Sequence, residues 1–180
     1  MVSERGIEAN PEKIEAKMGL SKQKMIKDVQ KLTGKITSLN RFIARLADRS
    51  LTFFKILRKV KDFKWKEECE QALNDLKTYL TTPLLLANLV IKRRLYVYLA
   101  VSEDAVRMVL VRENNGQQTP VYYVSRMLQG AEKKYIQIEK LALALVMTAR
   151  KLRPYFQLHP IVVFTNHSLK QIVSKPDVPG

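Results

Sequence analysis

The spacing of apolar residues changes near the middle of this 180-residue chain. In the first half, apolar residues recur every three or four positions, as they do when one face of a helix is buried. From about residue 94 they form short runs rich in β-branched and aromatic residues, which are typical of strands. The pattern therefore predicts a helical first part followed by a part that mixes strands and helices.

Four helices are predicted in the first part. Asn10 followed by Pro11 is a helix-start signal and opens a short helix that ends near Met18. The second helix runs from about residue 24 to residue 44. Its apolar stripe consists of Met25, Val29, Leu32, Ile36, Leu39, Phe42 and Ile43. The third spans residues 51–58, and the fourth follows Trp65. The inner side of the fourth carries Cys69, Ala72, Leu73, Leu76 and Leu80.

Strands dominate the second part. Residues 94–102, 106–112 and 118–126 are predicted strands, and Asn114-Asn115-Gly116 is a hairpin turn signal between the second and the third. A helix at about 137–151, a strand at 161–165 and a helix at 168–173 follow. The predicted class is α+β: a helical region at 1–82, a connector at 83–94, and a domain at 95–180 with three antiparallel strands, a helix, a strand and a helix.

The charge of the chain is strongly positive and unevenly distributed. The net charge is +15, and 13 basic residues between Lys17 and Lys61 face only Asp28 and Asp48. Such a field attracts polyanions, of which nucleic acid is the commonest in cells. The basic residues expected to share a surface, separate from the apolar stripe, are Lys24, Lys27, Lys31, Lys35, Arg41 and Arg45. The alternative is a solvated helix face that only keeps the protein soluble.

Composition also bears on the compartment. The single cysteine, Cys69, forms no internal disulfide and matches no metal-ligand spacing, which favours a reducing environment. The longest uninterrupted apolar run, residues 141–147, is far shorter than the roughly 20 residues needed to span a bilayer. No cleavable secretory signal opens the chain. We therefore expect an intracellular protein, cytoplasmic or nuclear, without membrane partners.

Eight short motifs occur in the order found in one family. They are residues 1–14, Asp28-Val-Gln-Lys-Leu-Thr-Gly34, Leu39-Asn-Arg-Phe-Ile43, Phe63-Lys-Trp65, Glu68-Cys-Glu-Gln-Ala72, Pro120-Val-Tyr-Tyr-Val-Ser125, Glu139-Lys-Leu-Ala-Leu-Ala-Leu145 and Lys151-Leu-Arg-Pro-Tyr-Phe156. The chain thus resembles a gypsy-type retrotransposon Pol polyprotein of the plant lineage (plant Metaviridae). The resemblance implies the palm end and helical thumb or connection region of a reverse transcriptase at 1–82, and an RNase H-like domain, incomplete and degenerate, at 95–180.

The resemblance also locates the family's catalytic positions. Family members carry Asp, Glu and Asp around a metal pair, and the equivalent positions here hold Ala100, Glu139 and Asn166. Two divalent ions about 4 Å apart need several anionic oxygens, and only Glu139 supplies a carboxylate. The paired aspartates of a polymerase palm, in the form Tyr-x-Asp-Asp, are absent from these residues. Neither DNA synthesis nor RNA cleavage is therefore expected of this chain alone.

Other groups near these positions are weaker candidates. Glu103 and Asp104 fall in the turn after the first strand, about 10 Å along an extended chain from Ala100. His167 follows Asn166, as histidine often does in the family, but a histidine without acidic neighbours is poor evidence for a general base. The tyrosines could form a base-stacking platform or simply pack as core and cross-strand pairs. They are Tyr96, Tyr98, Tyr122 and Tyr123.

The expected function is therefore not enzymatic. We expect a nucleic-acid-binding or structural tether module of a Pol polyprotein, with an RNA/DNA hybrid or other nucleic acid and further polyprotein domains as partners. No cofactor is expected, although active family members use Mg²⁺. Three alternatives remain: an active ribonuclease H, a basic module that binds an acidic protein or membrane surface, and a remnant reading frame without a selected role.

Overall fold

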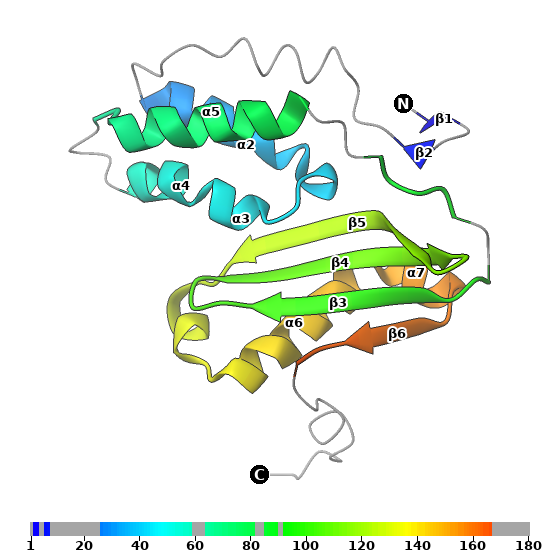
Figure 1. The fold of residues 1–180 in the computed structure, drawn as a ribbon. Coiled ribbons are helices and arrows are strands. Elements are labelled where there is room, and N and C mark those ends of the chain that lie inside the picture. Colours follow the sequence, from blue (N-terminus) through cyan, green and yellow to red (C-terminus); the bar gives the residue numbers. More distant parts are fainter. Residues whose placement is uncertain are drawn as a thin grey trace, which may run out of the picture. The chain divides into compact units, whose positions relative to one another are not determined.

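Two compact units make up the chain, residues 1–88 and residues 89–180. The computed structural model describes residues 2–3, 6–7, 26–58, 64–81, 85–89 and 92–166 (Figure 1). The predicted helices at 10–18 and 168–173 lie outside the described residues. The division between the units falls within the predicted connector at 83–94.

A small β-structure joins distant parts of the first unit. β1 (Val2–Ser3) pairs antiparallel with β2 (Gly6–Ile7). Ile7 in turn exchanges two backbone hydrogen bonds with Leu86, at 2.7 and 3.0 Å. Gly6 has a φ of 144°, and a Cβ there would lie 2.3 Å from the carbonyl oxygen of Leu86. Only glycine fits this position, because a side chain would be strained and would clash with backbone.

Helices form the rest of the described first unit. They are α2 (Ile26–Thr37), the 3₁₀ turn η1 (Asn40–Phe42), α3 (Leu46–Arg49), α4 (Leu51–Arg58) and α5 (Glu67–Thr81). One hydrophobic core joins these helices. Its buried members are Val29, Leu32, Ile36, Leu39, Ile43, Leu46, Phe53, Leu73 and Leu76. The prediction of helices at 51–58 and after Trp65 is confirmed.

The predicted helix at 24–44 is too long. α2 ends at Thr37, whose hydroxyl donates to the carbonyl of Thr33 at 2.7 Å, while the Ser38 hydroxyl donates to the carbonyl of Lys35 at 2.7 Å. Side-chain hydroxyls that donate to backbone carbonyls in this way compete with the backbone hydrogen bonds of a longer helix. Leu39 and Ile43 are nevertheless buried, because η1 and the following turn return them to the core.

Aromatic residues fix α5 against the other helices of the first unit. The Trp65 ring stacks on Phe53 with centroids 6.1 Å apart, and its indole N–H donates to Glu70 at 2.9 Å. The Tyr79 hydroxyl accepts the backbone N–H of Ala44 at 3.1 Å, and the Arg49 guanidinium lies 4.0 Å from the Tyr79 ring centroid. Both rings therefore combine apolar burial with a satisfied polar group.

A four-stranded mixed sheet forms the second unit, in the order β5-β4-β3-β6. The strands are β3 (Leu95–Val101), β4 (Ala105–Asn114), β5 (Gln117–Met127) and β6 (Ile161–Phe164). β3, β4 and β5 are antiparallel, and β6 pairs parallel with β3. Asn115 and Gly116 have φ values of 51° and 77°, as a type I′ hairpin turn requires. The predicted α+β class and hairpin are confirmed.

Helices cover one face of this sheet. α6 (Gln137–Lys151) and α7 (Arg153–Leu158) both lie on the same side of it, and the 3₁₀ helix η3 (Gly130–Lys134) precedes them (Figure 1). Leu95, Val97 and Leu99 alternate as buried residues of β3, which places them on the helix side. α7 was not predicted as a separate helix; Pro154 at its start interrupts the pattern after α6.

Candidate functional site

Ala100 and Asn166 lie at neighbouring positions of adjacent strands. β3 and β6 are in parallel register, with Tyr98 paired to Phe164. Continuing this register by two residues aligns Ala100, near the end of β3, with Asn166, just after β6. Both residues are exposed. The topology therefore brings together two of the three family-equivalent positions, but one has no side-chain oxygen and the other has only a neutral amide.

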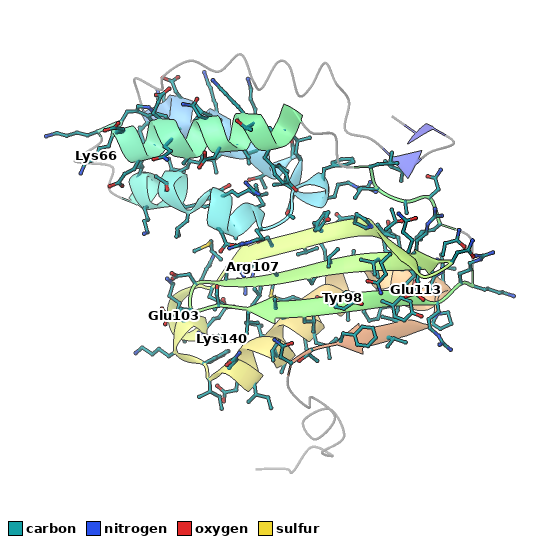
Figure 2. All side chains as sticks on the ribbon, viewed as in Figure 1. Lys66, Tyr98, Glu103, Arg107, Glu113 and Lys140 are labelled. Atoms are coloured by element: carbon teal, nitrogen blue, oxygen red, sulfur yellow. The ribbon has the colours of Figure 1, made fainter. Side chains whose placement is uncertain are left out.

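Arg107 is the cross-strand neighbour of Ala100. The two residues are paired in the antiparallel β3–β4 ladder, and directly opposed residues project to the same face of a sheet. The Arg107 guanidinium donates to the Ser102 hydroxyl at 3.3 Å. Figure 2 shows Arg107 on the sheet, with Glu103 and Lys140 at the same end. A cation thus lies beside the position where the family has a metal-binding carboxylate.

Glu139 has a structural role at the start of α6. Its carboxylate accepts the backbone N–H of Ile136 at 3.0 Å, and this contact satisfies a donor that the helix leaves without an internal partner. The side chain is exposed and lies in the first helical turn, where the helix dipole favours negative charge. Glu139 therefore caps the start of α6.

The turn after β3 holds its polar groups in local contacts. Asp104 forms an ion pair with Lys133, and the Lys140 ammonium donates to the Glu103 carbonyl oxygen at 3.4 Å. The Ser102 hydroxyl accepts the N–H of Ala105 at 3.1 Å. Glu103 and Asp104 lie in the turn, as predicted, and not on β3. His167 lies outside the described residues.

These side chains do not provide the donor set of a metal pair. Among the described residues, no three His, Cys, Asp or Glu side chains gather into a group that could hold a metal ion. At the family-equivalent positions, Glu139 is the single carboxylate, and it is engaged at the helix start. Arg107 adds positive charge beside Ala100, which disfavours a divalent cation there. The residues present do not fit the two-metal centre that the resemblance implies.

One ion pair near α6 favours the charged form of a carboxyl group. Arg126 on β5 donates to Glu132 of η3 at 2.7 Å, and the backbone N–H of Gln129 donates to the same carboxylate at 2.8 Å. The Arg126 guanidinium, and then the Gln129 N–H, hold the pKa of Glu132 below its ordinary value. Sequence reasoning missed this pair because its members lie six positions apart, on a strand and on a 3₁₀ helix that periodicity did not predict.

Three of the predicted phosphate-binding lysines lie on one exposed face of α2. Lys27, Lys31 and Lys35 follow one another at intervals of four residues, and all three side chains are exposed. The buried residues of α2 are Val29, Leu32, Thr33 and Ile36. At about 100° per residue, the lysines and this stripe occupy opposite sides of the helix. Lys24 lies outside the described residues.

Arg41 and Arg45 lie beyond the end of α2. The Arg41 guanidinium lies 5.3 Å from the Phe42 ring centroid. Arg45 has a left-handed backbone, with a φ of 56°, and its side chain pairs with Asp48 at 3.3 Å while staying 67% exposed. Because α2 ends at Thr37, neither arginine continues the helical row of lysines. We define the lysine face as Lys27, Lys31 and Lys35.

The tyrosines of the second unit divide between the two faces of the sheet. Tyr96 and Tyr98 both stack on Phe164, with centroids 5.8 and 5.1 Å apart. Tyr122 instead packs edge-on against Tyr155 of α7, with centroids 6.3 Å apart. Tyr98 also exchanges hydrogen bonds with Gln118, at 2.8 and 3.0 Å. These contacts are cross-strand and core packing, and they occupy the rings.

The sequence model of the RNase H-like domain found in reverse transcriptase matches residues 65–163. The chain belongs to this family. The match begins at Trp65, before α5, and continues to Val163 in β6. It therefore includes the whole antiparallel hairpin, α6 and most of β6, which carry Ala100, Arg107 and Glu139.

Relatives of this RNase H-like chain are polyproteins of mobile elements. The retrovirus-related Pol polyprotein from transposon 412 of Drosophila melanogaster is 31% identical over 127 residues, covering 71% of this chain and 10% of the relative. The Pol polyprotein from transposon opus of the same organism is 26% identical over 179 residues, covering 93% and 18%. The transposon Tf2-3 polyprotein of Schizosaccharomyces pombe is 24% identical over 169 residues, covering 92% and 13%. The chain thus spans less than a fifth of each of these relatives.

Solved structures share the fold. The foamy viral protease-reverse transcriptase in complex with RNA/DNA hybrid superposes with a TM-score of 0.81 at 18% identity, covering 97% of this chain and 24% of the viral chain. A second foamy viral structure, in complex with double-stranded DNA, gives a TM-score of 0.77 at 20% identity, covering 97% and 31%. This RNase H-like chain therefore has the fold of a retroviral reverse transcriptase region. In the part that the structure describes, no helix is long and apolar enough to cross a membrane.

Proposed function

We propose that this chain is a catalytically silent RNase H-like module that binds nucleic acid through phosphate contacts and tethers other domains of a Pol polyprotein. The observation that carries the proposal is that strand register aligns Ala100 with Asn166, two positions at which the resemblance implies carboxylates, and places Arg107 beside Ala100. A domain of this kind retains a surface and a shape but lacks the anionic oxygens that two-metal hydrolysis needs.

The lysine face supports the binding part of the proposal. Lys27, Lys31 and Lys35 are exposed on one side of a helix whose other side is anchored in the core. Lysine contacts with phosphates position a protein on a duplex without reading its sequence. The solved neighbours named above are complexes with an RNA/DNA hybrid and with double-stranded DNA. We therefore expect binding without sequence preference, because phosphate contacts carry no base information.

The binding test uses the whole chain and fluorescence anisotropy with hybrid, duplex and single-stranded probes. The logarithm of the binding constant falls linearly with the logarithm of the salt concentration, and each phosphate contact adds about 0.9 to the steepness of this slope. The triple variant should flatten the slope by about 2.7 units, which corresponds to three such contacts. It combines Lys27→Glu, Lys31→Glu and Lys35→Glu. The matched control reverses three other exposed lysines of the first unit, Lys55→Glu, Lys64→Glu and Lys66→Glu.

Two outcomes would reject the binding proposal. If the triple variant on the lysine face keeps full affinity at low salt, or matches its control, that face is only a solvated surface. Anionic vesicles and duplex DNA serve as competitors for the bound hybrid, compared at equal concentrations of negative charge. If the vesicles displace the hybrid at a lower concentration than the DNA does, the chain is a general basic interaction module.

We also propose that the polyprotein is of the gypsy type and of the plant lineage. The supporting observation is the ordered series of motifs, which includes residues 120–125, 139–145 and 151–156 of the second unit. The genomic DNA on both sides tests this proposal and the tether role together. Palm and integrase segments in the same reading frame would support both, and stop codons close to either end would support a remnant.

A further inference from the structure

A cavity lined by three arginines lies at the end of the sheet opposite to Arg107. It has a volume of about 210 Å³, and its charged lining consists of Arg93, Arg94, Arg112 and Glu113. Leu89 and Leu95 contribute apolar walls. We call it the arginine pocket. Figure 2 shows Glu113 at the opposite end of the sheet from Glu103, so the pocket is separate from the family-equivalent positions.

The size of the arginine pocket suits a small ionic group. Pockets for drug-sized ligands usually measure about 300–1,000 Å³, whereas a water molecule takes about 30 Å³ in the liquid. A cavity of about 210 Å³ therefore has room for one phosphate group with a few waters. It is too small to enclose a whole nucleotide, so a longer ligand would leave the rest of its chain outside.

The charge of the pocket favours an anion. Three arginines and one glutamate line the pocket, so its charged lining is positive overall. The planar fork of N–H donors of an arginine matches phosphate oxygens and can make two parallel hydrogen bonds. Glu113 is partly engaged elsewhere, since its carboxylate accepts from Gln118 at 3.2 Å.

The backbone that carries the arginines is held in place from two sides. The Arg93 carbonyl contacts the Nδ1 atom of the buried His159 at 2.9 Å, and the N–H of Leu95 donates to the Pro160 carbonyl at 3.0 Å. Arg112 is fixed by the sheet, where it pairs with Leu95 on β3 and Thr119 on β5. Although the side chains of Arg93 and Arg94 are exposed, their attachment points are fixed. A fixed backbone lowers the ordering cost of binding.

We propose that the arginine pocket binds a phosphate group of a nucleic-acid backbone. The inference rests on the proposed nucleic-acid binding and adds to it a phosphate contact on the second unit, apart from the lysine face. Free phosphate shares the recognised chemistry, so the two sources must be distinguished by experiment. A backbone phosphate is favoured because the open pocket admits one group while the strand continues outside, and because the whole chain carries a net charge of +15.

Arginine side-chain NMR on the whole chain tests the pocket directly. The Nε–Hε signals of Arg93, Arg94 and Arg112 are assigned by their loss in the single Arg→Gln variants. They should shift on addition of inorganic phosphate, and at far lower concentration on addition of an RNA/DNA hybrid or a ten-nucleotide thymidine strand. Shifts with phosphate but none with either nucleic acid would overturn the assignment to a nucleic-acid backbone. An absence of shifts with all three ligands would overturn the pocket as a phosphate site.

The salt dependence of hybrid binding tests the arginine pocket independently of the NMR signals. Arg93→Gln with Arg94→Gln should flatten the log-log salt slope for the hybrid by about one unit, because these substitutions remove one phosphate-binding site. The matched control replaces two exposed lysines of the second unit outside the pocket, Lys134→Gln with Lys151→Gln. Its slope should stay within about 0.3 unit of the parent, well below the change for a single phosphate. Equal slopes for both variants would overturn the inference.

Failure of the pocket and failure of the proposed function look different. If the hybrid binds and the lysine-face variant weakens it, but the three arginine signals stay still, the pocket is wrong and the binding function stands. If the chain binds no nucleic acid, the proposed function is wrong. The nucleic-acid assignment of the pocket fails with it, and the phosphate titration alone then decides whether an anion site exists.

Discussion

Ala100 and Arg107 are opposed residues of the β3–β4 ladder, so a guanidinium lies beside the position at which the family resemblance implies a metal-binding carboxylate. The Arg107 guanidinium also donates to Ser102, which keeps its charge close to the turn after β3. Restoring one aspartate would therefore first create an ion pair within the protein. A positive charge thus lies beside a position that carries no carboxylate.

The first prediction is that Ala100→Asp pairs with Arg107. A double-mutant cycle with Arg107→Gln should give a favourable coupling of about 0.2–1 kcal/mol, the range for partly exposed ion pairs. Urea unfolding at low and high salt measures it, and the coupling should shrink at high salt. A coupling of zero at low salt would mean that the two side chains do not meet.

The second prediction is that the purified chain does not cleave the RNA strand of a hybrid in Mg²⁺ or Mn²⁺. The reason is that Glu139 is the single carboxylate at the family-equivalent positions and caps α6. A gel assay with labelled RNA checks this. Metal-dependent cleavage that disappears in Glu139→Gln would show that the chain is an active ribonuclease H. Cleavage that persists in that variant would indicate a contaminating nuclease.

The third prediction concerns the core of the first unit. Leu32 is 1% exposed in that core, so Leu32→Ala should lower the free energy of unfolding of this unit by about 2–5 kcal/mol. Lys31→Ala, next to it but exposed, should change it by less than about 0.5 kcal/mol. Hydrogen exchange resolved by residue separates the units. Protection of β3 and β4 should be unchanged, and equal losses in both units would show that they unfold together.

The fourth prediction is a pH dependence from Glu132. Its pKa is lowered in the folded chain, so its contribution to stability is fully present above the ordinary carboxyl pKa and is lost as the pH falls through the lower folded pKa. Glu132→Gln should remove this part of the acid destabilisation of the second unit. Thermal unfolding near neutral pH and in acid checks it: the variant should be less stable than the parent near neutral pH, and the difference should narrow in acid.

The fifth prediction concerns the outer edge of β6. In the described part of the chain no strand pairs with this edge, and Phe164 is 43% exposed. Unpaired edges with apolar side chains favour association. Sedimentation velocity should show self-association that Phe164→Lys reduces, while Leu158→Lys, on the 54% exposed Leu158 of α7, should not. A monomer at every concentration would mean that the edge is protected.

Regular elements of the fold could be predicted because their signals are local. The hairpin at Asn115 and Gly116 follows from a turn that needs two positive φ values, and α5 follows from its apolar spacing. The end of α2 could not be predicted from apolar periodicity, because Leu39 and Ile43 are buried beyond the helix end. The buried stripe continued past the helix end and gave a helix that was too long.

The sequence indicated which residues form the candidate site, but not which side chains surround them. The family resemblance indicated Ala100, Glu139 and Asn166, and strand register then places Ala100 beside Asn166. Arg107 could have been found by counting across the β3–β4 turn, since Val101 pairs with Val106. The arginine pocket could not, because it depends on contacts of the segment near Arg93 with His159 and Pro160, 66 residues away in the case of His159.

The parallel pairing of β3 with β6 has a consequence for the order of folding. Leu95 pairs with Ile161, whereas the other strand pairs described in the second unit join neighbours in sequence. Pairing over such a separation is slow, because a long loop must close first. During synthesis the helices of the first unit can pack while the β3–β4–β5 meander is still waiting for β6 to leave the ribosome. Until then one edge of β3 is unpaired, and unpaired strand edges favour misassembly.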